Sequence, residues 1–331
     1  MSDNTTAPQR TDDTPKPLRA IAATIFARHG VNVSTVRRAG GWTNAVWLAD
    51  RLALRLCTVP NRDHLLREAR LATLFPSGVG YPSLVEAGCT LGYAWTLAER
   101  LPGTSLGEVW EGLAWQERQV ALQGLWTRAE AVHAVPVARA AAIVVPQRAW
   151  FNSNDPVEAE AGLARVTGAG ALSPSQRRVL RAALARFWEV EAEAPRVLSH
   201  GDLTLDNTMW HAGQVSALLD FEYALVAPVQ LDLNHLVKAA FGPDSGAVSA
   251  AAADARGAAA LRETVAASAR PRLAQPPERA LLMGYAILLE LWLLELWLGH
   301  PEGEGPLETW APLRRLRSLA HGDGGYLAPL L

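Results

Sequence analysis

The sequence changes its periodicity at Leu101-Pro102-Gly103, and this change constrains the fold more than any other feature. Before the break, short apolar runs of strand length alternate with turn residues. After it, long segments repeat apolar residues at helical spacing. At 331 residues the chain is about twice as long as a typical single domain. We therefore expect two lobes, the first rich in β-structure and the second larger and helical.

The first lobe is expected to span residues 17–102. It follows a tail, residues 1–16, whose Thr-, Asp- and Pro-rich composition predicts disorder. The apolar residues between Pro17 and His29 recur at helical spacing and predict one helix, and residues 62–75 predict a second. Strands are predicted at 33–38, 45–49, 52–57, 83–87 and 93–98.

The second lobe is expected to span residues 103–331 and to consist mainly of helices. These are predicted at about 105–112, 115–134, 156–166, 174–192, 228–240, 246–268, 277–299 and 304–320. One β-rich interval, 196–221, interrupts them. The order of elements predicts an α+β fold.

Composition excludes several classes of protein. With 31 Lys and Arg against 33 Asp and Glu, the net charge of −2 gives no basis for nucleic-acid or anionic-membrane binding. Residues 281–298 are strongly apolar, but Glu290 and Glu295 interrupt them, which favours a buried helix over a membrane span. Cys57 and Cys89 form no disulfide framework and no zinc spacing. The N-terminus lacks a secretory pattern, so a cytoplasmic location is expected.

The chemistry-bearing residues concentrate in the interval from Val197 to Tyr223. It reads as a short apolar run, a polar loop that contains Asp202 and Asn207, and two strands, the second of which delivers Asp220 at its end. A hairpin that follows a polar loop can bring these three side chains into one small volume. Turn-forming Asp and Asn residues of an ordinary hairpin are the structural alternative.

Phosphoryl transfer requires such a set of side chains. A carboxylate must orient the acceptor hydroxyl and accept its proton, and oxygen ligands must hold Mg²⁺ against the phosphates. Kinase-type catalytic loops place the base five residues before the metal-binding Asn, and a later Asp-Phe supplies a second metal ligand. Asp202 and Asn207 have this separation, and Asp220-Phe221 follows.

The pattern His200-Gly201-Asp202-x4-Asn207, followed by Leu219-Asp220-Phe221-Glu222, resembles the aminoglycoside phosphotransferase and choline kinase group of kinase-like enzymes. The resemblance runs from about residue 31 to 240. It implies a two-lobed, protein-kinase-like fold with the active site between the lobes and ATP or GTP as the co-substrate. It further implies Asp202 as the catalytic base and Asn207 and Asp220 as Mg²⁺ ligands. His200 and Asp232 would then support the catalytic loop.

The same resemblance places nucleotide-binding residues in the first lobe. Gly41, Thr43 and Asn44 fall in the turn expected over the phosphates. The position of the usual lysine holds Arg55, with Glu68 as its expected partner on the following helix. Since arginine and lysine are not equivalent at phosphate sites, either Arg55 replaces the lysine or nucleotide affinity is impaired.

The hinge of the resembled fold falls at Leu97–Gly103, where backbone groups near Ala98, Glu99 and Arg100 are expected to hydrogen-bond the adenine. His133 resembles a helical histidine of this group, and a satisfied core histidine is the simpler interpretation.

The acceptor is expected to be a small-molecule alcohol bound by the helices after residue 103. Acidic residues that could attract an amine favour a cationic antibiotic such as an aminoglycoside or a macrolide: Asp155, Glu158, Glu160, Glu222, Glu290 and Glu295. A housekeeping acceptor of the sugar, homoserine or choline type is the first alternative, because fold does not fix substrate. A catalytically silent nucleotide-binding protein, which Arg55 would explain, is the second.

Overall fold

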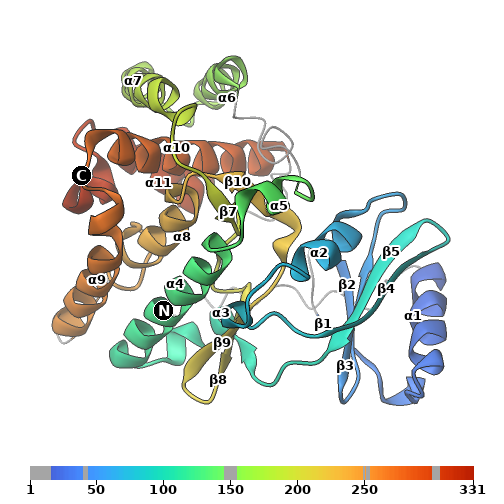
Figure 1. Ribbon diagram of the computed structural model, residues 1–331. Coiled ribbons are helices and arrows are strands. Elements are labelled where there is room, and N and C mark those ends of the chain that lie inside the picture. Colours follow the sequence, from blue (N-terminus) through green and yellow to red (C-terminus); the bar gives the residue numbers. More distant parts are fainter. Residues whose placement is uncertain (1–15, 40–43, 145–154, 249, 251–253, 300–305) are drawn as a thin grey trace. The chain divides into compact units, whose positions relative to one another are not determined.

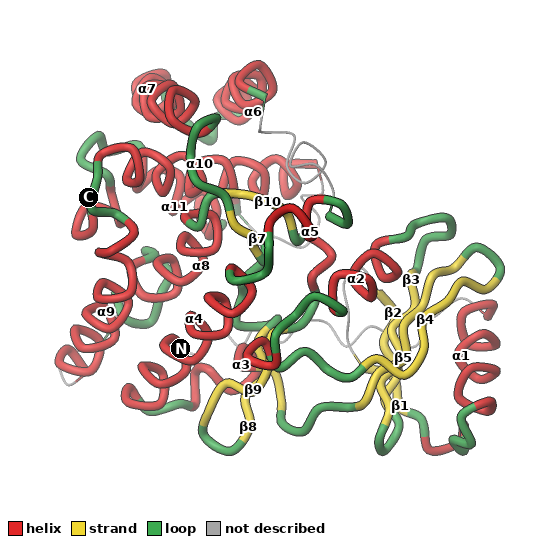
Figure 2. Tube along the Cα trace, viewed as in Figure 1, coloured by secondary structure: helices red, strands yellow, loops and turns green. Residues whose placement is uncertain are grey.

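The computed structural model describes residues 16–39, 44–144, 155–248, 250, 254–299 and 306–331. The tail predicted to be disordered therefore lies outside the described residues, apart from Lys16. The chain divides into two compact units, and Figures 1 and 2 show their elements. The first unit comprises Met1–Arg70 and Pro82–Pro102, and the second comprises Leu71–Tyr81 and Gly103–Leu331.

The first unit is built on one antiparallel sheet with the strand order β1-β2-β3-β5-β4. The strands are β1 (Arg37–Ala39), β2 (Asn44–Leu48), β3 (Leu52–Cys57), β4 (Leu84–Thr90) and β5 (Tyr93–Glu99). The expected turn at Asp50-Arg51 joins β2 to β3, where the Ala49 amide donates to the Leu52 carbonyl at 2.8 Å. The predicted strand at 33–38 begins later, because Asn32 caps a short 3₁₀ turn over Val33–Thr35.

Two helices of this unit, α1 (Lys16–Arg28) and α2 (His64–Ala72), use opposite faces of the sheet. Alternate residues of a strand point to opposite faces. Leu54 and Leu56 pack in the hydrophobic cluster that includes the buried side of α1. Cys57 instead packs with Leu65 of α2. Arg55 has the same parity as Cys57, so β3 presents it on the α2 side.

The second unit is mainly helical. Its helices are α3 (Leu106–Val109), α4 (Trp115–His133), α5 (Val137–Ala141), α6 (Pro156–Gly168), α7 (Pro174–Glu191), α8 (Gln230–Phe241), α9 (Ala255–Ala269), α10 (Pro276–Gly299) and α11 (Ala311–Leu319). The helix expected at 105–112 forms only one α-turn before a 3₁₀ turn, and that expected at 246–268 begins at Ala255. Short α5 lacks enough residues to show helical periodicity, and the sequence did not predict it.

Two small sheets position the polar loop. One pairs β7 (Val197–Ser199) with β10 (Leu225–Ala227), and the other has the order β6-β8-β9, from Thr104–Ser105, Thr208–His211 and Gln214–Leu218. The β-rich interval predicted at 196–221 is therefore split between two sheets. β10 lies beyond its predicted end, because it is defined by pairing with β7 across the intervening loop.

Residues 71–81 belong to the second unit, although the sequence placed them in the first lobe. Leu71 and Val79 are buried in the core cluster of the second unit. Gly80 lies so close to β9 that a Cβ there would stand 2.1 Å from the Ser216 carbonyl oxygen. Long-range packing of this kind leaves no local signature in the sequence.

Helix α10 is long and apolar enough to cross a membrane by length and composition alone. In the structure its central residues are buried against α6, α7, α8 and α11. Glu290, at the middle of the helix, is fully buried and paired with Lys238 and Arg315. The apolar composition of α10 is therefore explained by its burial in the core of the second unit.

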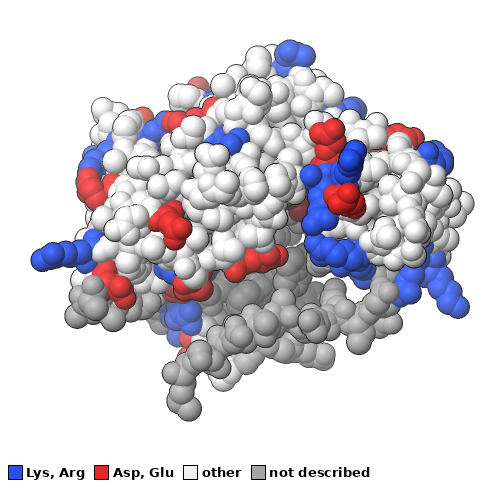
Figure 3. All heavy atoms as spheres, turned by 90° about the horizontal axis from the view of Figure 1, so that it is seen from below, with Lys and Arg blue, Asp and Glu red and all other residues white. Residues whose placement is uncertain are grey.

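Charged side chains are interspersed on the face drawn in Figure 3. Lys and Arg lie beside Asp and Glu in small groups there, and the described residues of that face form no broad positive surface. Nucleic-acid phosphates are usually bound by such a surface.

Candidate active site

The polar loop between β7 and β8 is fixed by its own backbone. The Thr204 amide donates to the Asp202 carbonyl at 2.8 Å, and the Leu219 amide donates to the Asn207 carbonyl at 2.8 Å. The second bond ties the residue before Asp220 to Asn207. Gly201 has a φ of +82°, and a Cβ at this position would stand 2.2 Å from the Tyr223 carbonyl oxygen. The turn that precedes Asp202 therefore requires glycine.

Asp202 and Asn207 are in direct contact. The Asn207 Nδ2 donates to Asp202 Oδ2 at 2.8 Å and to the Asp202 carbonyl at 3.0 Å. Because the amide nitrogen faces the carboxylate, the amide oxygen is the group left for another ligand. Within the described part of the chain, Asn207 Oδ1 accepts no hydrogen bond.

Asp220 follows β9 in a left-handed backbone conformation, with φ 62° and ψ 68°. Few residues other than glycine adopt this region, and Asp and Asn tolerate it best. Residues held in this way cluster at functional sites. The conformation turns the chain sharply between β9 and the 3₁₀ turn at Phe221–Tyr223.

Burial and neighbouring charges change the pKa of Asp202. Burial raises the pKa of Asp202 above its ordinary value; His200 opposes this rise, and the nearby charge of Asp220 adds to it. The hydrogen bond from Asn207 and the charge of Lys238 also favour the ionised form. A carboxylate with a raised pKa is a better proton acceptor than an exposed one.

Asp232 of α8 holds the start of the loop. Its Oδ2 accepts from the His200 amide at 2.8 Å, and its Oδ1 accepts from the Gly201 amide at 3.0 Å. His133 Nε2 of α4 bonds the same Oδ2 at 2.9 Å. Burial alone would raise the pKa of Asp232, but the His133 bond, the His133 and His200 charges and the Gly201 amide together lower it.

His200 joins the loop to the hairpin. Its Nε2 lies 2.9 Å from the Leu219 carbonyl, and the Asp202 amide donates to its Nδ1 at 3.3 Å. Nε2 thus faces the Leu219 carbonyl, and Nδ1 accepts from the Asp202 amide. The supporting positions expected for His200 and Asp232 are the positions that the structure gives them, and His133 is a hydrogen-bonded core histidine.

The residues proposed for Mg²⁺ have suitable chemistry. Mg²⁺ is commonly held by one or two carboxylates, with substrate phosphates and waters completing the shell. Asp220 and the amide oxygen of Asn207 are hard oxygen donors of this kind. Among the residues that the structure describes, no three His, Cys, Asp or Glu side chains form a metal site by themselves. As one carboxylate and one amide oxygen, Asp220 and Asn207 fit a Mg²⁺ ion that completes its shell with other oxygen ligands.

In the first unit, Arg55 and Glu68 form the expected ion pair. Arg55 NH1 donates to Glu68 Oε1 at 2.7 Å and to Oε2 at 2.8 Å. The Glu68 side chain is 1% exposed and the Arg55 side chain 20% exposed. The pair thus joins β3 to α2 and leaves part of the guanidinium accessible.

The other nucleotide-binding candidates in the expected phosphate turn of this unit are Gly41, Thr43 and Asn44. Gly41 and Thr43 lie outside the described residues. Asn44 is buried, and its Oδ1 is bonded to His64 Nε2 of α2 at 2.8 Å. This contact commits the Asn44 side-chain oxygen to holding β2 against α2.

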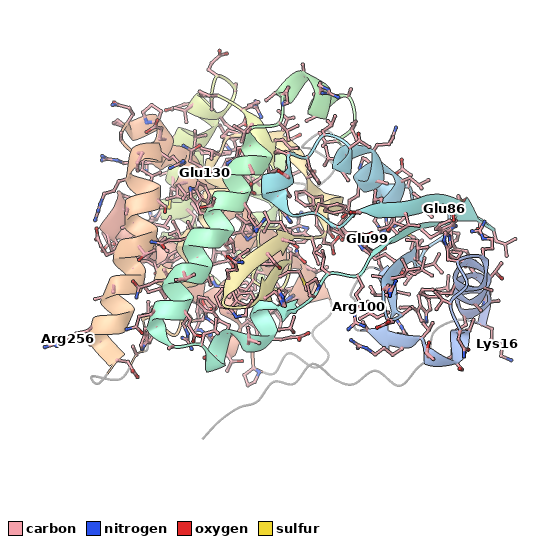
Figure 4. All side chains as sticks on the ribbon, turned by 60° about the horizontal axis from the view of Figure 1, so that its bottom comes forward. Lys16, Glu86, Glu99, Arg100, Glu130 and Arg256 are labelled. Carbon is pink, nitrogen blue, oxygen red and sulfur yellow. The ribbon has the colours of Figure 1, made fainter. Side chains whose placement is uncertain are left out.

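The predicted hinge, Leu97–Gly103, comprises the last three residues of β5 and the segment after it (Figure 4). Ala98 pairs with Ala53 and Leu84 in the sheet. The Glu99 amide donates to the Ser83 carbonyl at 2.9 Å, and the Arg100 amide donates to the Arg51 carbonyl at 2.9 Å. Both amides are therefore used within the unit, so an adenine contact through these residues would have to use other backbone groups.

Four of the six acidic residues considered for an amine acceptor have other partners. Glu160 pairs with Arg177, and Glu295 pairs with Arg165. Asp155 caps α6 by accepting from the Val157 amide at 2.8 Å. Glu290 is bound by two cations. These carboxylates stabilise the helical unit instead of standing ready for a ligand.

Sequence reasoning singled out Asp232 of α8 but missed three other polar residues of this helix. Asn234, His235 and Lys238 lie in a helix that is otherwise almost wholly buried. The described residues offer no hydrogen-bond partner to the side chains of Asn234 and His235. Three polar residues within an apolar helix were the available signal, because buried polar groups are rare and usually have a function.

Comparison with known proteins gives one family and several structural relatives. A family described as "Phosphotransferase enzyme family" matches residues 34–273. Homoserine kinase of Methylocella silvestris is 31% identical over 153 residues, which cover 42% of this chain and 43% of that enzyme. The chain thus spans less than half the length of this curated relative.

Solved structures with a similar fold include two aminoglycoside phosphotransferases. Aminoglycoside 2'-phosphotransferase-IIIa in complex with GDP has a TM-score of 0.65 at 17% identity, over 90% of this chain and 97% of that one. A thermostable mutant of aminoglycoside phosphotransferase APH(4)-Ia with ADP and hygromycin B has a TM-score of 0.63 at 14% identity, over 92% and 99%. At these identities the likeness concerns the fold.

Proposed function

Because the chain belongs to the phosphotransferase enzyme family, we propose that it transfers the γ-phosphate of ATP or GTP to a hydroxyl of a small molecule. The family resemblance and the kinase-like α+β fold expected from the sequence are confirmed. The nucleotide, the metal and the roles of single residues are parts of the proposal. A cytoplasmic location, where both nucleotides are available, accompanies it.

The observation that carries the proposal is the contact between Asp202 and Asn207, on a loop that Asp232 and His200 hold in place. Asp202 Oδ2 accepts from Asn207, which leaves Oδ1 for a substrate hydroxyl. In the proposed step, the hydroxyl oxygen bonds to the γ-phosphorus while the bond from that phosphorus to the β,γ-bridging oxygen breaks. The nucleoside diphosphate leaves, and the hydroxyl proton passes to Asp202.

Asn207 and Asp220 are the residues that would hold Mg²⁺. The metal, when bound, neutralises charge on the phosphates of the nucleotide. Asn207 has a second effect that needs no metal, because its Nδ2 fixes the orientation of the Asp202 carboxylate. Loss of Asn207 should therefore disturb both metal affinity and the geometry of the base.

Arg55, oriented by Glu68, is proposed to bind nucleotide phosphate in place of lysine. Its partly accessible guanidinium supports this role. If Arg55 impairs nucleotide binding instead, the second alternative applies, and the protein is a catalytically silent nucleotide-binding protein. A thermal-shift titration with Mg-ATP and Mg-GTP, on the native protein and on Arg55→Met, separates these possibilities.

The acceptor is proposed to be a small metabolite alcohol of the homoserine, choline or sugar type. The partial match to a homoserine kinase supports this class over a cationic antibiotic. The paired state of Glu160, Glu290 and Glu295 removes much of the charge argument for an aminoglycoside or macrolide amine.

The proposal is tested by an acceptor panel that covers both classes, with ADP or GDP release as the measurement. Turnover by the native protein should exceed that of Asp202→Ala for at least one acceptor. Asp254→Asn, at an exposed position before α9, is the control and should behave as the native protein does. Equal rates in the native protein and Asp202→Ala across the panel would contradict the proposal.

A further inference from the structure

Arg128 of α4 joins two parts of the second unit that lie far apart in the sequence. Its Nε donates to the Val215 carbonyl of β9 at 3.0 Å, and its Nη1 donates to the Gly78 carbonyl at 2.9 Å. Gly78 lies in the 3₁₀ turn at Ser77–Val79, within the segment that leads from α2 to β4. One guanidinium therefore bridges this turn and β9.

The bond to Val215 serves an edge strand. β9 is the last strand in the sheet order β6-β8-β9, and α4 packs along it (Figure 1). Edge strands present backbone groups that need partners from outside their sheet. Because a guanidinium holds its N–H donors in a rigid plane, Arg128 fixes the two carbonyls relative to each other.

The charge of Arg128 is partly buried, and no carboxylate among the described residues pairs with it. Burial lowers the pKa of its guanidinium below the ordinary value. Partial burial of a charge opposes folding unless hydrogen bonds offset it. The bonds to the two carbonyls provide this compensation, so the contacts that hold Arg128 in place are the contacts that join the turn to β9.

Gly80 brings the turn against the same strand. Its φ is +72°, and a Cβ at this position would stand 2.1 Å from the Ser216 carbonyl oxygen and 2.7 Å from Arg128 Nη1. Glycine alone permits this approach without strain. The turn, the guanidinium and β9 thus form one close-packed group.

β9 leads directly to Asp220. The strand ends at Leu218, and the Leu219 amide donates to the Asn207 carbonyl at 2.8 Å. Asp220 follows in its left-handed conformation. Arg128 therefore holds the strand on the N-terminal side of Asp220.

The segment that Arg128 binds also packs on the C-terminal side of Asp220. Phe221, the next residue, has its ring centroid 4.4 Å from that of Phe75 and 5.8 Å from that of Tyr81. Phe75 and Tyr81 flank the bound turn in the sequence, and their own ring centroids lie 5.5 Å apart. Arg128 is thus connected to both neighbours of Asp220, through β9 before it and through this segment after it.

On the basis of the proposed phosphotransferase function, we propose that Arg128 is a positioning residue for Asp220, the proposed Mg²⁺ ligand. A left-handed conformation of a residue other than glycine is strained, and it persists where the surrounding structure fixes it. Arg128 contributes to fixing both sides of Asp220. Without the guanidinium, the backbone around Asp220 should relax, and its carboxylate should hold a metal ion less well.

Arg279 offers a matched control in the same unit. It is also partly buried, and its Nε and Nη2 donate to the Leu273 and Ala274 carbonyls at 2.9 and 3.5 Å. These carbonyls lie six and five residues before it in the sequence, at the start of α10. Arg279→Leu therefore removes an arginine with two carbonyl bonds and leaves β9 untouched.

The first measurement is hydrogen exchange at the Leu219 amide, which requires neither metal nor activity. Arg128→Leu should speed this exchange by about tenfold or more, the effect of losing one hydrogen bond from a charged group. Amides at the buried centre of α10 should keep their native rates, because the opening is local. Arg279→Leu should leave exchange at Leu219 unchanged.

The second measurement is the dissociation constant of Mn²⁺, a paramagnetic probe, in the presence of ADP. Arg128→Leu should weaken Mn²⁺ binding by about fivefold or more, because the strained conformation of Asp220 is no longer held. ADP affinity without metal should stay native. With an active acceptor, kcat should fall more than the acceptor KM rises.

Arg128→Lys provides the conservative variant. It keeps the charge and one donor group but loses the rigid fork, so exchange at Leu219 and Mn²⁺ affinity should lie between those of the native protein and Arg128→Leu. If circular dichroism shows that Arg128→Leu is unfolded, Arg128→Lys gives the same comparison with a smaller expected effect.

Native exchange at Leu219 in Arg128→Leu would overturn the inference, and so would equal acceleration of Leu219 and the α10 amides. Faster exchange at Leu219 with native Mn²⁺ affinity would also overturn it, because Asp220 would then not depend on Arg128. The two levels of proposal fail differently. If the native protein binds no Mn²⁺ with ADP, the phosphotransferase proposal fails, while exchange at Leu219 still decides whether Arg128 holds the strand.

Discussion

At the scale of single residues, the hydrogen bonds of Asp232 explain how the loop before Asp202 keeps its shape. Asp232 is fully buried and accepts three hydrogen bonds, from the two backbone amides of the loop and from His133. The sequence indicated a supporting role through the family resemblance. It could not specify the partners, since they come from α4 and the loop, far away in the chain.

Asp232→Asn should destabilise the protein in a pH-dependent way. The pKa of Asp232 is lowered in the folded state, so its contribution to stability is complete above its unfolded pKa of about 4 and declines as pH falls through the lower folded value. We expect a loss of about 2 kcal/mol or more at neutral pH, since buried amides lose a charged acceptor.

Urea unfolding of the native protein and Asp232→Asn between neutral pH and the acid limit of folding measures this effect. The difference between the two should shrink below about pH 4. Exposed Asp254→Asn should show no comparable change. A difference that stays constant with pH would show that ionisation of Asp232 does not contribute.

Gly201→Ala tests the turn in front of Asp202. Its φ of +82° disfavours alanine, and the new Cβ would clash with the Tyr223 carbonyl, 2.2 Å away. We expect destabilisation of about 3 kcal/mol or more, from strain and overpacking together. Gly213→Ala is the matched control, because its φ is +77° but nothing lies within 4 Å of the added Cβ.

Gly213→Ala should lower the free energy of unfolding by only about 1 kcal/mol, because alanine disfavours the left-handed backbone conformation but meets no clash there. Chemical denaturation of both variants gives the comparison. Equal losses in the two variants would mean that the close approach to Tyr223 does not constrain the loop.

At the scale of elements, helix α10 illustrates what periodicity predicts and what it does not. Its extent was predicted at 277–299, and it spans Pro276–Gly299. Its apolar composition also fits a membrane span, and only the contacts with neighbouring helices account for Glu290. Helix α8 is similar: its length was expected, but the hydrogen bonds of Asp232 to the loop could be seen only in the structure.

Packing of α10 against α7 can be tested at Gly284. A Cβ there would stand 2.1 Å from the ring of Phe187, which is itself fully buried. Gly284→Ala should therefore destabilise the protein by about 1–3 kcal/mol through overpacking, despite the higher helix propensity of alanine.

Gly299→Ala, at the end of the same helix, meets no atom within 4 Å and should be neutral or slightly stabilising. Thermal unfolding of the two variants measures the contrast. If Gly284→Ala matches Gly299→Ala, the close contact between α7 and α10 is not tight in solution.

At the scale of the whole molecule, the sequence predicted the class of fold, and its motif named Asp202 and Asn207, which are in contact in the structure. It did so because a short motif and two contrasting periodicities carry this information locally. It placed residues 71–81 in the first lobe, since nothing local shows that Leu71 and Val79 pack in the core of the second unit. The sequence also could not show which carboxylates remain available to bind an amine acceptor, because this depends on which of them pair with arginine in the fold.

The central claim is that Asp202 accepts the proton of a hydroxyl during phosphoryl transfer. The most direct measurement is single-turnover transfer of labelled γ-phosphate to an active acceptor by the native protein and by Asp202→Asn, together with the nucleotide dissociation constant of each. We predict a rate loss of about a hundred- to ten-thousandfold in the variant, with nucleotide affinity retained. A variant that transfers phosphate at the native rate would contradict the account.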